Sequence, residues 1–149
     1  MFRGISNLSL DAKGRFAVPT RYREDLSAQC GGSLIITVSA DDPCLAIYPL
    51  PVWLEIERQL DALPGTNRKA TRIKRLLIGH ATEVSLDASG RLLVPPELRE
   101  FASLNKGAVL VGQGKKFELW DEESWRAAMY SDEGEDEGDG PEALELIAL

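Results

Sequence analysis

Histidine and cysteine are scarce in this chain, which has one His and two Cys among 149 residues. His80 has no acid or nucleophile motif beside it, and Cys30 and Cys44 do not have the spacing of metal ligands. These absences argue against a zinc cluster and against a scaffold held by several disulfides. We expect both cysteines to be free thiols in a reducing cytosol, with a disulfide between them as the alternative.

Sequence motifs of catalysis and of membrane insertion are also missing. There is no Gly-rich phosphate loop and no Ser motif of the hydrolase type. No apolar run approaches the length of a membrane span, and the first residues, MFRGI, lack the apolar core of a signal peptide. We therefore expect a cytoplasmic protein that is not an enzyme and has no cofactor, no metal and no membrane partner.

Charge is distributed unevenly along the chain, whose net value is −7. Residues 1–120 hold 16 Lys or Arg and 13 Asp or Glu, whereas residues 121–149 hold one base and 11 acids. A mildly basic body suits a polyanionic partner in spite of the net charge. We predict that residues 130–149 form a disordered acidic tail. This tail either competes with a polyanion for the basic body or only improves solubility.

One phrase occurs twice in the sequence. Residues 9–24 read SLDAKGRFAVPTRYRE, and residues 85–100 read SLDASGRLLVPPELRE, with every matched residue 76 positions apart. Weaker matches follow downstream at a separation of 72, so the second copy has lost four residues. A repeat of this length indicates a duplicated supersecondary unit.

The pattern of each copy predicts the element order β-β-α-β-β-α, with a basic helix between the copies. We assign repeat 1 to residues 5–53, linker helices to 54–80 and repeat 2 to 81–129. Because four short strands cannot bury both of their faces, the two repeats are expected to interleave. The predicted fold class is α+β and β-rich: one pseudo-symmetric small β-barrel with short peripheral helices.

The polar centre of the repeated phrase predicts two hairpin tips. Asp11 and Asp87 begin Asp-Ala-x-Gly-Arg, in which the Asp and the Gly supply turn chemistry. A turn does not need Arg, yet Arg15 and Arg91 recur at the same place. Arg offers a planar set of donors suited to phosphate or to guanine. Lys13 adds charge to the first tip only, because Ser89 replaces it in the second. The alternative is a plain turn with an exposed ion pair.

Other basic residues have several interpretations. Arg68, Arg72 and Arg75 recur on one face of the predicted inter-repeat helix, with Lys69 and Lys74 beside them. This face is a solvated surface, a second phosphate contact or a subunit contact. Arg21 and Arg23 are expected to be surface charges or partners of Glu24 and Asp25. Arg3 is a further candidate for the face that carries the tips.

The chain resembles the MraZ family of bacterial regulators, which are built from two copies of the AbrB-like (SpoVT-AbrB) swapped-hairpin unit. The resemblance covers roughly residues 1–128. It rests on the start MFRG, the two phrases LDAKGRFAVP and LDASGRLLVP, RLLIGHA between them, and LVGQGKKFELWDEESW near the end.

This resemblance implies a sequence-specific DNA-binding repressor of its own promoter, at the head of the division and cell-wall gene cluster. It implies a ring-like homo-oligomer that reads direct repeats in double-stranded DNA and localises to the nucleoid. The implied DNA-binding residues are those at the tips: Asp11, Lys13, Arg15, Asp87 and Arg91. The alternative is a protein-interaction ring whose hairpin tips are structural and whose basic helix docks a partner.

Overall fold

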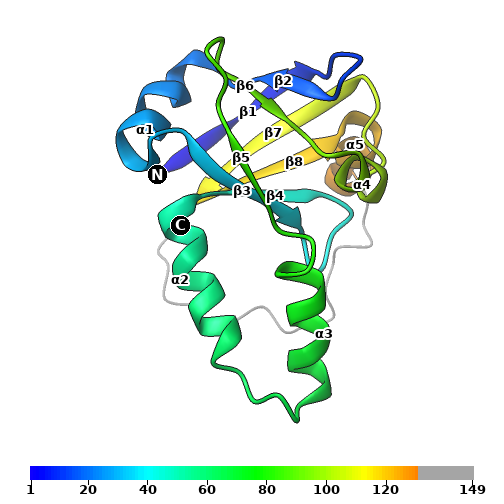
Figure 1. Ribbon diagram of the computed structural model, residues 1–149. Coiled ribbons are helices and arrows are strands. Elements are labelled where there is room, and N and C mark those ends of the chain that lie inside the picture. Colours follow the sequence, from blue (N-terminus) through cyan, green and yellow to red (C-terminus); the bar gives the residue numbers. More distant parts are fainter. Residues whose placement is uncertain (131–149) are drawn as a thin grey trace, which may run out of the picture.

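A computed structural model describes residues 1–130; the predicted acidic tail, apart from Tyr130, lies outside these residues. The strands and helices follow one another along the chain as shown in Figure 1. The first part contains β1 (Phe2–Ser9), β2 (Arg15–Ala17), α1 (Thr20–Cys30), β3 (Ser33–Val38), β4 (Leu45–Pro49), α2 (Leu50–Asp61) and α3 (Arg68–Leu77). The second contains β5 (Thr82–Ser85), β6 (Arg91–Leu93), α4 (Pro96–Phe101), β7 (Gly107–Gly114), β8 (Phe117–Asp121) and α5 (Glu122–Tyr130).

This order matches the predicted β-β-α-β-β-α units with a basic helix between them. Local chemistry explains several boundaries. Asn67 begins α3, because its side chain accepts hydrogen bonds from the backbone N–H groups of Lys69 and Ala70. α1 ends at Gly31, which adopts the left-handed conformation and donates its N–H to the carbonyl of Ser27.

The strands form a large antiparallel sheet and a separate ribbon. The sheet has six strands in the order β1-β7-β8-β4-β3-β5, and β2 pairs only with β6. Four of the six pairings join one repeat to the other: β1 with β7, β3 with β5, β4 with β8, and β2 with β6. The two repeats are therefore interleaved, and the fold is mixed α+β and rich in strands.

The predicted single barrel is not what the strand pairing shows. Within residues 1–130 the large sheet ends at β1 and β5, so hydrogen bonding does not close it. The reason lies in β2 and β6, which span three residues each and pair with one another instead of joining the sheet edges. The equivalent pairings also differ in length, since β1 matches eight residues of β7 whereas β5 matches four of β3. The pseudo-symmetry of the two repeats stays a prediction.

The main core lies between this ribbon and the sheet. Phe16 of β2 and Leu92 of β6 are paired, and each is only 1% exposed. They belong to the same buried cluster as Leu34, Ile47 and Phe117 of the sheet strands. The side chains on the other face of the ribbon are half-buried or exposed, because side chains alternate along a strand. Burial of the inner face thus fixes which residues face outward.

The ribbon and the helical pair α2–α3 lie at opposite ends of the molecule. In Figure 1, β2 and β6 are at the top of the sheet, and α2 and α3 extend below it. α4 and α5 lie at one side, beyond the ends of the central strands. Within residues 1–130, no helix combines the length and the apolar character that a membrane span requires.

A substitution within the ribbon tests its role in the core. We expect Phe16→Ala to lower the free energy of unfolding by about 3–5 kcal/mol, because it leaves a cavity beneath the ribbon. The exposed neighbour Leu93 provides the matched control, and Leu93→Ala should change that free energy by less than about 0.5 kcal/mol. Urea denaturation at one protein concentration measures both values. Equal losses for the two variants would contradict this account of the ribbon.

Candidate nucleic-acid interface

The first hairpin tip is organised by the carboxylate of Asp11. Its Oδ1 accepts hydrogen bonds from the backbone N–H groups of Lys13, at 3.0 Å, and Arg15, at 2.9 Å. Its Oδ2 accepts a third bond from Nε of Arg15, at 2.7 Å. Two backbone bonds, Gly14 to the carbonyl of Asp11 and Asp11 to that of Arg15, close the turn. One carboxylate therefore shapes the turn and orients the guanidinium group.

The second tip repeats this arrangement bond for bond. Oδ1 of Asp87 accepts from the backbone N–H groups of Ser89 and Arg91, and Oδ2 accepts from Nε of Arg91 at 2.9 Å. Ser89 takes the place of Lys13 without loss, because only the backbone N–H of that residue contributes. The two ion pairs are similarly exposed, and such pairs contribute less than about 1 kcal/mol to stability. The main effect of each ion pair is to orient the guanidinium group of its Arg.

These hydrogen bonds keep both carboxylates ionised. The pKa of Asp11 falls from 3.8 to about 2, chiefly because the backbone N–H of Arg15 donates to it. The pKa of Asp87 is lowered for the same leading reason, the hydrogen bond from the backbone of Arg91. Each Asp therefore carries a negative charge at neutral pH and can hold its Arg in place.

Each tip is also covered by an Arg from the other repeat. Arg99 of α4 donates from Nε to the carbonyl of Val94 and lies against Gly14, where a Cβ would come within 2.6 Å of that nitrogen. Arg23 of α1 donates to the carbonyl of Val18 and lies in the same way against Gly90. Both glycines have positive φ angles, of 88° and 75°, which disfavour any other residue. Glycine at these two positions allows both the positive φ of the turn and the close approach of the Arg side chain.

Arg23 and Arg99 are the residues that sequence reasoning missed. Arg23 is half-buried and binds a backbone carbonyl, so the expectation that it is a surface charge or a partner of Glu24 or Asp25 was wrong. Arg21, in contrast, is exposed as expected, and it donates to the hydroxyl groups of Ser6 and Tyr22. The available signal was the repeat itself, since Arg99 follows Arg23 by the same 76 positions that separate the tips.

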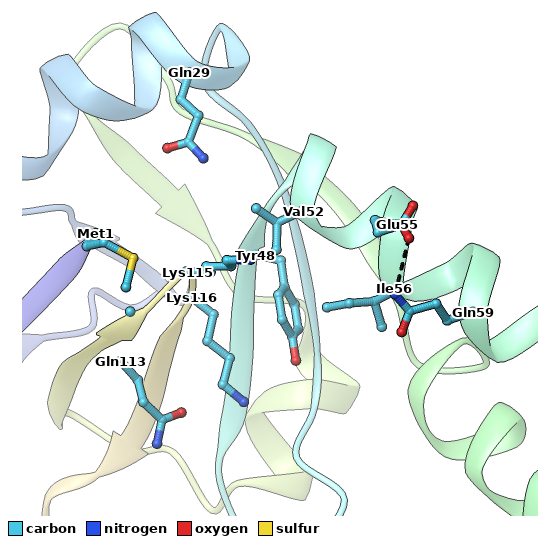
Figure 2. Close-up of a pocket in the computed structure, with 11 residues that line it drawn as sticks. Met1, Gln29, Tyr48, Val52, Glu55, Ile56, Gln59, Gln113, Lys115 and Lys116 are labelled. Atoms are coloured by element: carbon cyan, nitrogen blue, oxygen red, sulfur yellow. Dashed lines mark hydrogen bonds between the residues drawn. The ribbon is translucent and has the colours of Figure 1, made fainter. Parts of the chain in front are cut away.

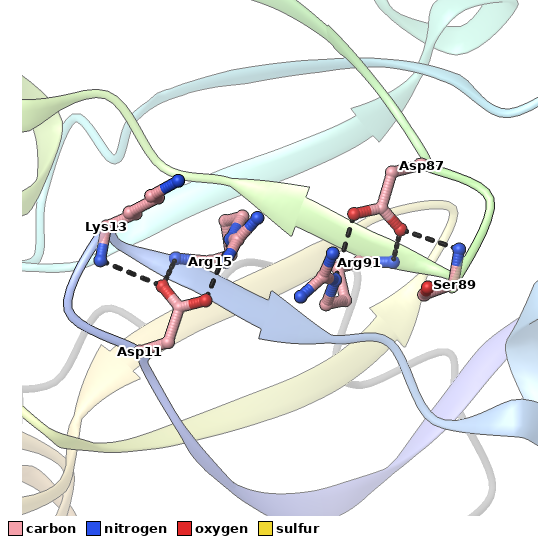
Figure 3. Close-up of polar contacts among 6 residues, drawn as sticks. All are labelled: Asp11, Lys13, Arg15, Asp87, Ser89 and Arg91. Atoms are coloured by element: carbon pink, nitrogen blue, oxygen red, sulfur yellow. Dashed lines mark hydrogen bonds and ion pairs between the residues drawn. The ribbon is translucent and has the colours of Figure 1, made fainter.

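The structure brings the two tip arginines together on one surface. β2 and β6 pair with Arg15 opposite Leu93 and Ala17 opposite Arg91. The two arginines are thus diagonal neighbours on one face, about 7–8 Å apart. Figure 3 shows them side by side between the two Asp residues. Within residues 1–130 the terminal Nη atoms of both make no hydrogen bond, so their donors are available to a ligand.

The other predicted residues are placed less uniformly. Lys13 lies at the first tip with an exposed side chain. Arg3 is near the start of β1, six residues before Ser9, which is roughly 20 Å along the strand from the end that leads to the tips. The structure therefore groups Asp11, Lys13, Arg15, Asp87 and Arg91 but not Arg3.

The basic face of α3 is a separate surface. None of the ion pairs among residues 1–130 includes any of its five cations, Arg68, Lys69, Arg72, Lys74 and Arg75. Four of them, all except Lys74, line a shallow hollow of about 510 Å³. Because α3 and the ribbon are at opposite ends of the molecule, a ligand lying flat on one does not reach the other.

A groove of about 700 Å³ lies between α2 and the β7–β8 hairpin (Figure 2). Tyr48, Val52 and Ile56 give it an apolar wall, and the ammonium group of Lys116 lies 5.6 Å from the centre of the Tyr48 ring. Its one carboxylate, Glu55, is bound by Arg58 and Gln59, and the hydrogen bond from Arg58 is the main reason that its pKa falls to about 2. Glu55 is therefore held in its ionised form by these two neighbours.

The low pKa of Asp11 leads to a pH prediction. A carboxylate with a depressed pKa supports the folded tip above its unfolded pKa, near 3.9, and loses that effect as the pH falls through about 2. In an NMR titration of the folded protein, we expect the carboxyl carbon of Asp11 to stay unchanged from pH 7 down to about 3. Arg15→Ala should raise this pKa only in part, since the backbone N–H of residue 15 remains. A midpoint near 4 in the unaltered protein would contradict the described hydrogen bonds.

Comparison with known proteins identifies the family of this chain. A family model described as "MraZ protein" matches residues 1–76 and again residues 77–140, one match for each repeat. Among curated relatives, the transcriptional regulators MraZ of Pseudomonas putida and Pseudomonas entomophila are each 55% identical over 132 residues, covering 89% of this chain and 87% of theirs. The transcriptional regulator MraZ of Pseudomonas aeruginosa is 54% identical over the same coverage. These relatives are named as regulators of transcription and not as enzymes, and the chain belongs to the MraZ family.

Proposed function

We propose that this chain is a sequence-specific DNA-binding repressor that inserts the β2–β6 ribbon into the major groove. The observation that carries the proposal is the pair Arg15 and Arg91, held identically on the outer face of the ribbon, with Nη donors that make no hydrogen bond within residues 1–130. The major groove of B-DNA admits a two-stranded β-ribbon, and Arg bound through both donors to guanine is its commonest specific contact.

The Asp residues make this contact more selective. Because Oδ2 binds Nε, the edge of each guanidinium group that carries the Nη atoms faces away from the tip. An Arg held in this way loses less conformational freedom when it binds a base. The two arginines, about 7–8 Å apart on the diagonal, span roughly two base-pair steps of 3.4 Å. We assign a phosphate contact to Lys13, whose side chain is exposed at the first tip.

One ribbon makes few contacts, so an oligomer is part of the proposal. A head-to-tail ring presents every ribbon in the same sense and at a regular spacing, which suits direct repeats in DNA. Several ribbons on one assembly gain affinity through effective concentration. The proposed operator lies in the promoter of this gene, with control extending to the division and cell-wall gene cluster. A cytoplasmic, nucleoid-associated location follows from DNA binding.

A protein-interaction ring is the second candidate. Its supporting observation is the set of cations on α3, which have no ion-pair partner among residues 1–130. In that case an acidic partner binds α3, and the two tips are structural. The domain assignment of residues 5–53, 54–80 and 81–129 serves both candidates, with α3 in the linker.

Substitution of the tip arginines tests the proposal. We expect Arg15→Ala and Arg91→Ala each to cost about 1–3 kcal/mol of discrimination per ribbon, which in an assembly abolishes specific binding. Arg72→Ala on α3 is the matched control, because it removes the same charge at the far end of the molecule. Gel retardation of the DNA upstream of this gene measures binding, and light scattering checks that the oligomer persists. The proposal would be overturned if both tip variants bound that DNA fragment as strongly as the unaltered protein does.

Salt dependence separates the two candidates. Each phosphate contact should contribute about −0.9 to the slope of log affinity against log salt concentration. We expect a steep negative slope for DNA, reduced by Lys13→Ala and unchanged by Arg72→Ala. A slope that responds to Arg72→Ala and not to Lys13→Ala would instead favour α3 as the charged contact surface.

A further inference from the structure

The outer face of the ribbon has four side chains and is not symmetric. Arg15 and Ala17 come from β2, and Arg91 and Leu93 come from β6. Positions 76 apart have matching roles in the backbone, since β2 and β6 pair around Phe16 and Leu92. The side chains at positions 15 and 91 match, since both are Arg. Those at positions 17 and 93 do not, because one is Ala and the other is Leu.

Leu93 is unusually exposed for its position in the fold. Leu93 is 49% exposed, whereas its neighbour Leu92 is 1% exposed. It lies directly opposite Arg15, a placement that brings Cβ atoms within about 4.5–5.5 Å of each other. An apolar side chain therefore stands opposite Arg15, and only a methyl group stands opposite Arg91.

The major groove offers a partner for an apolar side chain next to an Arg. Thymine places its C5 methyl group there, and apolar side chains recognise it by contact. We propose that Leu93 contacts the methyl group of a thymine adjacent to the guanine bound by Arg15, and that this contact gives the ribbon one direction on DNA. This inference rests on the proposed function and adds a specificity-determining residue to it.

The direction follows from symmetry. A ribbon with identical halves binds a site equally well in two orientations, related by rotation about the Phe16–Leu92 pair. Arg15 and Arg91 alone do not distinguish these orientations, since their hydrogen bonds are the same. Leu93 distinguishes them because its counterpart, Ala17, is too short to make the same contact. Lys13 and Ser89 add a second difference at the tips.

A simpler role for Leu93 is support for the aliphatic stem of Arg15. Replacing thymine by uracil in the DNA distinguishes this role from contact with the thymine methyl group. Uracil differs from thymine only by the missing methyl group. In the shortest duplex from upstream of this gene that the full chain binds, each thymine is replaced by uracil in turn. We expect replacement at one position, the same in each direct repeat, to weaken binding by about fourfold, the effect of burying one methyl-sized group. Leu93→Ala should bind the thymine and uracil duplexes equally.

Ala17→Leu is the matched variant, because it restores an apolar side chain to the other half. It should add a second uracil-sensitive position, related to the first by the two-fold axis of the ribbon. The inference is overturned if uracil has no effect at any position, or if Leu93→Ala weakens binding to the thymine and uracil duplexes by the same factor. Failure of the unaltered protein to bind any upstream duplex would be a different result, since it removes the proposed function itself.

Discussion

The pairing of β2 with β6 is the interaction on which the rest of this structure depends. It joins residues 76 positions apart and places Phe16 against Leu92 over the main core. The same pairing turns Arg15 and Arg91 toward solvent on one face. Two backbone bonds extend it, from Val18 to the carbonyl of Gly90 and from Val94 to that of Gly14. Core and candidate interface are therefore opposite faces of a single ribbon.

Exposed ion pairs at the tips act on geometry more than on stability. An exposed pair such as Asp11 with Arg15 contributes less than about 1 kcal/mol, so the fold does not depend on it. What the carboxylate provides is order, because it accepts three hydrogen bonds from its own turn. Arg99 then lies against Gly14 from the other repeat, so that each tip contacts both halves of the chain. A preorganised Arg of this kind suits base recognition.

The molecule has a charged surface at each of two opposite ends, the ribbon and α3. At the ribbon, each Arg is matched by an Asp, and the local charge is nearly balanced. On α3, five cations lie within ten residues without an ion pair in the described part of the chain. At the ribbon, an Asp thus orients each Arg and offsets its charge. On α3, no ion pair within residues 1–130 orients the cations. This contrast favours the ribbon over α3 as the surface for the proposed specific readout.

The sequence by itself determined the duplication, the order of the elements and the chemistry of each tip, because these depend on residues close together in the chain. Asp, Gly and Arg within five positions specify the turn and the ion pair. Only the tertiary structure decided that the two tips share one face, that Arg23 and Arg99 lie against the glycine of the opposite tip, and that the large sheet stays open. It also set the length of β1, Phe2–Ser9, through eight matched residues of β7. Each of these outcomes depends on pairing between distant segments, which local pattern does not encode.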